Sequence, residues 1–386
     1  MIQHLLPVWG YSRFSAAARD IGLPGAEKKD AGARGEAVGW FDGPPMHYPH
    51  ALISPVHWQK PFHFPASAYI FGDSGGFSLA SKTMSDKLKV DPVGVLRWQE
   101  SLCTVGCILD RPPVGLRPDQ RIWEQGKRET IEHTIRALPV YKEMLQRGTK
   151  FRWWGILHGS NVAEIREYYA AIAAVYPFDQ PGEGWAIRPE PRVDIDASTR
   201  SLRVLKQLGI TRAHFLAATS QDVIAVLLAL GPQAGLEMLT YDSAYAVKSG
   251  FNRHVFRPND DGLTFSIMTE VGESRESRDW LLNKCPCPVC AHMRVRSEQE
   301  PRAHAQLHSK VFGGWWSSWL QFHDLYVQQD LTQRQAEYAE KNPEGLLRKM
   351  LSVTDYSRIM RVFEADGHEK NSIVRTGSSQ SLLDFI

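Results

Sequence analysis

The segment AYIFGDSGG, residues 68–76, joins a short apolar run to an aspartate, a serine and two glycines. It begins a part of the chain in which runs as long as a strand alternate with segments of helical period. The later runs are VGCIL, WWGIL, GWAI, HFLA and EMLTY, which start near residues 105, 153, 184, 213 and 237. One expected helix face carries Ile131, Ile135, Leu138, Tyr141 and Leu145, and another carries Ile165, Tyr169, Ile172 and Val175. The pattern predicts repeated βα units and a parallel sheet.

A polar side chain follows five of these strands. These residues are Asp73, Asp110, His158, Arg188 and Asp242. A doubly wound sheet would fit the alternation, and polar residues can simply end strands. A barrel, however, gathers the carboxyl ends of its strands onto one face and forms its active site there. Asp110 and Asp242 interrupt apolar contexts, where unpaired carboxylates cost several kcal/mol to bury. We therefore expect an α/β fold, a TIM-like (β/α)8 barrel, with these side chains in one pocket.

Composition limits the class of protein. The chain has 386 residues, of which 43% are hydrophobic and 23% charged, and this excludes wholesale disorder. The formal net charge is only +2, so a polyanionic partner would need a local basic patch. No run of 18 apolar residues occurs, and the N-terminus does not resemble a secretion signal. We expect a cytoplasmic protein with no membrane partner.

The chain divides into four expected segments. Residues 1–65 are rich in Gly, Pro and Ala, and we expect an irregular segment packed on the barrel. Residues 66–280 form the barrel core. Residues 281–330 form a zinc-binding subdomain near the C-terminus, and residues 331–386 form closing helices.

The motif CPCPVC concentrates three of the five cysteines. Cys285, Cys287 and Cys290 have a spacing that suits a metal ion in a reducing compartment better than disulfides. Zinc prefers four sulfur or imidazole ligands in a closed tetrahedron, so we expect Zn²⁺ here. The candidates for the fourth ligand are His292, His304, His308 and His323. The other two cysteines, Cys103 and Cys107, are expected in the core.

Several of these motifs together resemble the tRNA-guanine transglycosylase superfamily. In order they are DSGGF at 73–77, Asp110, GILHG at 155–159, the Tyr-Asp pair ending at Asp242, and C-x-C-x-x-C. The resemblance covers roughly residues 69–325. His323, Asp324 and Leu325 are similar to the family's His-Asn-Leu sequence, which implies that His323 is the fourth zinc ligand.

The chain also departs from the family pattern around the base-binding pocket. Ser78 and His158 each stand where the family has glutamine. Arg188, Pro189 and Glu190 replace the family's Gly-Gly-Leu. Retention of both aspartates with an altered pocket resembles the paralogous 7-deazaguanine DNA transglycosylases.

The resemblance implies a role for each site residue. Asp242 would be the nucleophile that forms a covalent intermediate with the sugar, and Asp73 the general acid and base. The implied base-binding residues are Ser74, Gly75, Asp110, His158 and Gly159. Lys248 and Arg253 follow the nucleophile and are expected to bind nucleic-acid phosphates.

The implied activity is that of a pentosyltransferase that replaces guanine in DNA with a 7-deazaguanine such as 7-cyano-7-deazaguanine. Its partners would be DNA, the free 7-deazaguanine base and other DNA-modification proteins. One alternative is an enzyme that acts on tRNA. Another is a catalytically silent subunit that binds nucleic acid.

Overall fold

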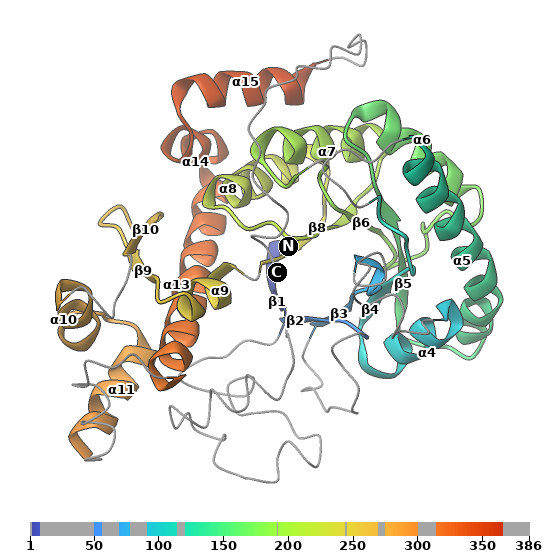
Figure 1. Cartoon of the computed structure of the whole chain (residues 1–386). Helices are drawn as coiled ribbons and strands as arrows, with labels where there is room; N and C mark the ends of the chain where they lie inside the picture. The colour runs from blue at the N-terminus through green and yellow to red at the C-terminus, as the bar shows by residue number, and fades with distance from the viewer. Residues whose placement is uncertain are drawn as a thin grey trace.

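Eight short strands, each parallel to its neighbours, form a barrel-like sheet at the centre of the computed structural model (Figure 1). They are β1 (Ile2–Pro7), β2 (His50–Ile53), β3 (Tyr69–Gly72), β4 (Val105–Cys107), β5 (Arg152–Leu157), β6 (Trp185–Ile187), β7 (Arg212–Phe215) and β8 (Met238–Asp242). The structure describes residues 2–7, 50–55, 69–77, 91–113, 120–190, 192–243, 245–268, 275–299 and 314–365. All six strands expected from residue 69 onward are present.

The first strand closes the sheet. The backbone of β1 pairs with β8, with Leu5 opposite Asp242, and with β2, with Leu6 opposite Ala51. The expectation that residues 1–65 are an irregular segment packed on the barrel is therefore corrected, because two barrel strands come from it. Both strands are short, and the Gly-, Pro- and Ala-rich sequence between them hid their periodicity.

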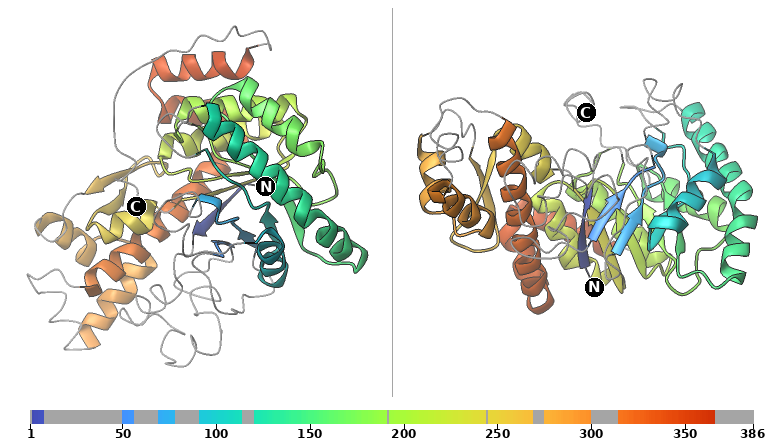
Figure 2. Two further views of the ribbon diagram at one scale, coloured as in Figure 1. Left: turned by 45° about the vertical axis from the view of Figure 1, so that its right-hand side comes forward. Right: turned by 90° about the horizontal axis from the view of Figure 1, so that it is seen from below.

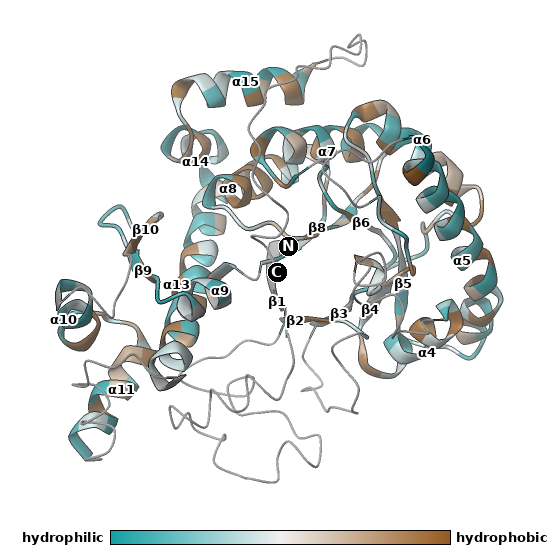
Figure 3. Cartoon of the chain, in the orientation of Figure 1, coloured by the Kyte–Doolittle hydropathy of each residue, from teal (hydrophilic) through white to brown (hydrophobic). Residues whose placement is uncertain are grey.

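Helices alternate with the strands from β3 onward and cover the outside of the barrel (Figure 1). They are α4 (Pro92–Leu102), α5 (Gln120–Gln146), α6 (Val162–Ala173), α7 (Ile195–Gln207) and α8 (Gln221–Leu230), followed by the short η1 (Pro232–Ala234). Most residues that connect β1, β2 and β3 lie outside the described part of the chain, so the described architecture is a mixed α/β barrel. Figure 3 shows hydrophilic residues along the outer faces of α5 and α6. No described helix is both long and apolar enough to span a bilayer.

Helix α5 is present where the periodicity predicted it, and four of the five residues of the predicted face pack on the core, but Ile135 does not. Ile135 is 53% exposed, whereas Thr130, Thr134 and Tyr141 are buried. The buried threonine hydroxyls donate to backbone carbonyls one turn earlier, at 2.8 Å. Because these small polar side chains meet their hydrogen-bonding needs within the helix, they can pack against the barrel in place of the isoleucine.

Aromatic rings fill the barrel interior. Phe71 of β3 stacks on His214 of β7 with ring centroids 4.1 Å apart, and it meets Trp154 of β5 edge-on at 5.7 Å. Strands β3 and β7 lie on opposite sides of the ring of strands, so this contact crosses the interior. Alternate residues of a strand point the same way, so the side chain of Asp73 points to the same side as that of Phe71. Asp73 lies closer to the carboxyl-terminal end of the barrel. By the same alternation, the side chain of His158 points to the same side of the sheet as that of Trp154.

A second group of elements lies beside the barrel (Figure 2). It consists of α9 (Tyr245–Phe251), the antiparallel pair β9 (Val255–Pro258) and β10 (Phe265–Met268), α10 (Arg275–Asn283), α11 (Pro288–Gln299) and α13 (Gly314–Lys341). Helix α13 runs unbroken through residues 330 and 331, where the expected zinc-binding and C-terminal segments meet. The chain continues into α14 (Pro343–Met350) and α15 (Val353–Glu364), which pack on α8 and α7 respectively.

Candidate active site and metal centre

The turn after β3 depends on both of its glycines. Gly75 has φ of 77°, a backbone conformation that residues with a side chain rarely adopt. A Cβ atom on Gly76 would lie 2.2 Å from Oδ1 of Asp110, so only glycine fits there. The Gly75 N–H donates to Oδ2 of Asp73 at 3.2 Å, and the Gly76 N–H donates to Oγ of Ser74 at 2.9 Å. The DSGG sequence thus lets the β3 turn approach the turn after β4 closely.

Gln99 of α4 ties the ends of these two strands together. Its buried Nε2 donates to the carbonyls of Gly72 at 3.0 Å, Asp73 at 3.3 Å and Cys107 at 2.9 Å. A Cβ on Gly72 or on Gly106 would clash with the Gln99 side chain, at 2.8 Å and 2.5 Å respectively. Sequence analysis did not identify Gln99, although a polar residue among the buried positions of an amphipathic helix was an available signal.

Asp73 lies at the barrel mouth among other carboxylates. The pKa of its carboxyl is raised from 3.8 to about 7, mainly by burial and then by the negative charges of Asp110 and Asp242, while the Gly75 hydrogen bond lowers it. Asp73 follows β3, Asp110 follows β4 and Asp242 ends β8, so the three carboxylates lie at the carboxyl-terminal ends of parallel barrel strands. A carboxyl with this pKa can both give and take a proton near neutral pH.

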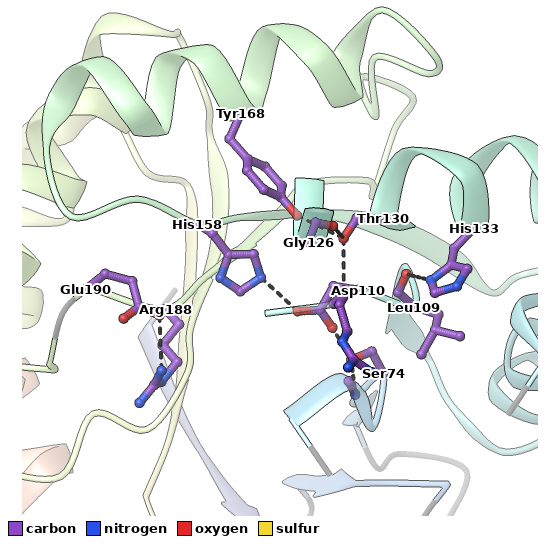
Figure 4. A network of polar contacts seen from close by, with 12 residues as sticks. Ser74, Leu109, Asp110, Gly126, Thr130, His133, His158, Tyr168, Arg188 and Glu190 are labelled. Atoms are coloured by element: carbon purple, nitrogen blue, oxygen red, sulfur yellow. Dashed lines mark hydrogen bonds and ion pairs between the residues drawn. The ribbon is translucent and has the colours of Figure 1, made fainter. Parts of the chain in front are cut away.

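Asp110 is buried, and both of its carboxylate oxygens have protein donors (Figure 4). Oγ of Ser74 donates to Oδ1 at 2.5 Å, and Nε2 of His158 contacts Oδ2 at 2.7 Å. The ring of Tyr168 meets the His158 ring edge-on, with centroids 5.3 Å apart. The Tyr168 hydroxyl donates to Thr130, which also accepts the N–H of the residue after Asp110. Helices α5 and α6 therefore fix this carboxylate and imidazole in place.

His158 has one ring nitrogen without a partner. Nδ1 is buried and has no hydrogen bond within the described residues. Figure 4 shows Arg188 and Glu190 on one side of this ring, with Asp110 and Ser74 on the other. Arg188 donates to Glu190 at 3.0 Å, and its guanidinium lies 5.8 Å from the centre of the Phe77 ring. Burial raises the pKa of Glu190, whereas Arg188 and His158 lower it. An unpartnered buried nitrogen beside this ion pair is suited to a polar ligand.

Asp242, the last residue of β8, is held through one of its oxygens. Oδ1 accepts the N–H of Ala217 at 2.9 Å and lies 3.3 Å from Nε2 of His214. Ala217 has φ of 60°, which is unusual for a residue other than glycine and directs its N–H toward the carboxylate. Sequence analysis placed His214 and Ala217 in the strand HFLA but assigned them no role. Their positions depend on the contact between β7 and β8, which no local pattern reveals.

Three further expected site residues, Gly159, Lys248 and Arg253, lie in the described part of the chain. Gly159 follows His158 and has φ of 151°, and a Cβ there would meet Ile165 at 2.7 Å, so its role in the turn is steric. Lys248 lies on α9, where burial lowers the pKa of its amine. Arg253 is exposed in the turn after α9. Ser78 lies outside the described residues.

The three clustered cysteines and His323 come together as expected. Their four ligand atoms all lie within 4.8 Å of one another and are buried. Nδ1 of His323 is 3.7 Å, 3.2 Å and 3.4 Å from the sulfurs of Cys285, Cys287 and Cys290. Nε2 of His323 lies 3.0 Å from the carbonyl of Phe256. A carbonyl only accepts, so the ring proton is on Nε2 and Nδ1 is free to bind a metal ion.

The electrostatics of the cluster also favour a cation. Hydrogen bonds from Cys287 and Cys290 lower the pKa of Cys285, while burial raises the pKa of Cys290. Three buried thiols cannot all ionise together without a compensating positive charge. The cluster can therefore hold a metal ion. Two of the candidate histidines, His304 and His308, lie outside the described residues, and His292 is not in the cluster. Cys103 and Cys107 are buried core residues, as expected.

Comparison with known proteins adds no family assignment. No protein-family model matches this chain, and no curated protein sequence matches it.

Proposed function

We propose that this protein is a base-exchange pentosyltransferase, which removes guanine from a nucleic acid and attaches a 7-deazaguanine to the same sugar. The observation that carries the proposal is the environment of Asp73, whose pKa of about 7 reflects burial and the charges of Asp110 and Asp242. Base exchange needs one carboxyl that transfers protons and another that stays ionised to attack. Asp73 and Asp242 have different surroundings, because Asp242 lies beside an imidazole and accepts the Ala217 N–H, whereas Asp73 is buried near two other carboxylates.

The reaction would proceed in two balanced steps. In the first, a carboxylate oxygen of Asp242 bonds to the anomeric carbon as the glycosidic bond breaks. The bonding electrons pass to the guanine nitrogen, which takes the proton of Asp73. In the second, Asp73 removes a proton from the incoming base, whose nitrogen attacks the anomeric carbon and releases the Asp242 carboxylate. Asp73 thus ends the cycle protonated, as it began.

The base would bind beside Asp110 and His158. Asp110 is an acceptor for the amino and ring N–H groups of a purine edge, and Nδ1 of His158 is a buried polar atom that a ligand can satisfy. Ser74 keeps the Asp110 carboxylate in position, and Gly75 keeps the turn clear of a side chain. A site of this kind discriminates strongly against bases that lack the matching groups, because these polar groups would then remain unpaired.

The choice of DNA as the polymer rests on the altered pocket. Where the resembled tRNA enzymes have two glycines, this chain has Arg188 and Pro189, and Arg188 is paired with Glu190 and lies near the ring of Phe77. A side chain of this size changes the space and the donors available to the base. The target nucleotide must leave its stack to reach the mouth, at a cost of a few kcal/mol. An orthodox tRNA enzyme is the alternative.

We further propose that the barrel is a TIM-like (β/α)8 barrel and that the Cys₃His cluster binds zinc. Bond lengths of about 2.3 Å to sulfur and 2.0 Å to nitrogen in a tetrahedron separate these ligand atoms by about 3.5 Å. The sulfur-to-nitrogen distances of 3.2, 3.4 and 3.7 Å fit this value. Zinc held by four protein ligands supplies structural bracing, since no coordination position is left for substrate. All chemical steps are therefore assigned to the carboxylates.

A direct test uses labelled 7-cyano-7-deazaguanine with duplex DNA and, separately, with tRNA. We expect label in the DNA, with digestion and mass analysis of the nucleosides identifying the exchanged base. Label only in the tRNA would move the assignment to the alternative. Label in neither polymer, with the zinc-loaded protein, would overturn base exchange.

A second test traps the covalent intermediate on a denaturing gel. Wild-type protein should form an adduct that Asp242→Ala lacks, while the exposed control Asp260→Asn keeps it. An adduct of equal yield in Asp242→Ala would remove Asp242 as the nucleophile. Nucleic-acid binding without any adduct in wild-type protein would support a silent binding subunit.

A further inference from the structure

His214 is a buried histidine in the interior of the barrel. Its side chain is fully inaccessible, and its ring stacks on Phe71 with centroids 4.1 Å apart and planes inclined by 22°. An apolar residue would fill this position without bringing polar atoms into the core. A buried imidazole is costly unless its two nitrogens find partners. The two groups nearest those nitrogens belong to β8.

Both of these groups lie on one strand, two residues apart. Nδ1 of His214 is 2.8 Å from the hydroxyl oxygen of Thr240, and Nε2 is 3.3 Å from Oδ1 of Asp242. Residues 240 and 242 point to the same side of β8, because side chains alternate along a strand. The Nε2–Oδ1 contact is within ion-pair distance but does not meet hydrogen-bond geometry, and Nε2 has no hydrogen-bond partner among the described residues. The ring thus bridges Thr240 and Asp242 from the neighbouring strand.

The chemistry of the two partners determines where the ring proton lies. An ionised carboxylate only accepts hydrogen bonds, so Nε2 must carry the proton in order to interact favourably with Asp242. Nδ1 is then an acceptor, and the Thr240 hydroxyl can donate to it. A hydroxyl that donates to one nitrogen fixes the tautomer and the orientation of the ring. Thr240 therefore donates to His214, and His214 directs its N–H toward the acceptor Asp242.

We infer that His214 is a positioning residue for the Asp242 carboxylate, with Thr240 fixing the ring. The inference rests on the proposed function and specifies which atom reacts. Oδ1 receives both the Ala217 N–H and the His214 ring, whereas no contact is recorded for Oδ2 within the described residues. Oδ2 is accordingly the oxygen that bonds to the anomeric carbon. Anchoring one oxygen orients the other, and misplacement of a reacting group by about 1 Å can cost about 100-fold in rate.

Three substitutions separate the polar contacts of His214 from its packing. His214→Phe keeps an aromatic ring against Phe71 but removes both nitrogens. His214→Gln places an amide N–H near the position of Nε2 and so keeps a donor to Asp242. Thr240→Val removes the hydroxyl with little change of volume. His254→Phe, which lies outside the barrel interior, is the control for the loss of a histidine.

The measured quantity is the single-turnover rate of adduct formation, together with the dissociation constant for the same nucleic acid. We expect His214→Phe to slow adduct formation by about 10- to 100-fold with binding unchanged, and His214→Gln to recover most of the rate. Thr240→Val should fall between wild type and His214→Phe. Adduct formation by His214→Phe within threefold of wild type would overturn the inference. Equal slowing by His214→Phe and His214→Gln would also overturn it, because the donor would then not matter.

A measurement without substrate separates this inference from the proposed function. Nitrogen-15 NMR of the histidine rings in the zinc-loaded protein should show the His214 proton on Nε2, with a resonance that moves in Asp242→Asn. A proton on Nδ1, or a resonance that Asp242→Asn leaves in place, would overturn the positioning role even if the enzyme is active. Absence of any adduct in wild-type protein would instead overturn base exchange, while the spectrum still decides whether His214 holds Asp242.

Discussion

Replacing Asp73 with asparagine should stabilise the protein at alkaline pH while abolishing its activity. The folded state holds the pKa of this carboxyl near 7, mainly through burial and then through the charges of Asp110 and Asp242. In the unfolded chain the pKa returns to about 3.9. Between these values the unfolded state releases a proton that the folded state keeps. Unfolding therefore becomes more favourable as the pH rises from about 4 to about 7.

The size of this effect follows from the two pKa values. The difference between 3.8 and about 7 corresponds to about 4 kcal/mol, at 1.36 kcal/mol for each unit of pKa. Asp73 is only partly buried, so solvent screening reduces this figure. We expect Asp73→Asn to raise the free energy of unfolding by about 2 to 4 kcal/mol at pH 8 and to leave it unchanged near pH 4.

Urea denaturation monitored by tryptophan fluorescence at several pH values provides the assay. The exposed Asp260→Asn makes the same chemical change on the surface and should show no pH-dependent difference from wild type. The difference between Asp73→Asn and wild type should grow as the pH is raised and level off above about pH 8. A constant difference at every pH, or a variant less stable than wild type at pH 8, would refute the assigned environment of Asp73.

Three further outcomes follow from the geometry. Gly76→Ala should destabilise the fold by about 1 to 3 kcal/mol and weaken base binding, because the new Cβ would lie 2.2 Å from Oδ1 of Asp110; unchanged base affinity in calorimetry would contradict this. Gln99→Leu should cost about 1 to 3 kcal/mol, since three carbonyls lose a buried donor, whereas the exposed Gln125→Leu should cost little in the same denaturation assay. Wild-type protein should contain about one zinc per chain by elemental analysis, and His323→Ala should lose both the metal and thermal stability.

The sequence predicted the parts of the fold whose cause is local. Strands such as β5 are continuous apolar runs, and the turn at Asp73 contains the two glycines that its geometry requires. The metal cysteines were recognisable because the ligands are close in sequence. His323 was one of four candidates on spacing, and the resemblance to a family selected it. The structure then brought it to the cluster.

The parts that the sequence did not reveal depend on contacts between distant segments. β1 is recognisable as a barrel strand only through its pairing with β8 at the other end of the core. Counting apolar residues could not show that Ile135 of α5 is exposed while Thr130 and Thr134 are buried, because the threonine hydroxyls bond within the helix. Gln99 also contacts the end of β3, and His214 lies beside Asp242 at the end of β8, and both contacts require the strands to be side by side. These roles can be recognised only when the order of the strands in the barrel is known.

Helix α13 links the metal cluster to the barrel, and this link affects how the protein unfolds. His323 near its start belongs to the metal cluster, and Thr332, nine residues later (332 minus 323), accepts a hydrogen bond from Tyr241 at 2.8 Å. Tyr241 directly precedes Asp242 in β8. Removal of a metal ion from the cluster would thus loosen the same helix that contacts the strand ending in Asp242, so the two regions should belong to one cooperative opening unit. Amide exchange at β8 should accelerate on chelation even though the cluster lies outside the barrel.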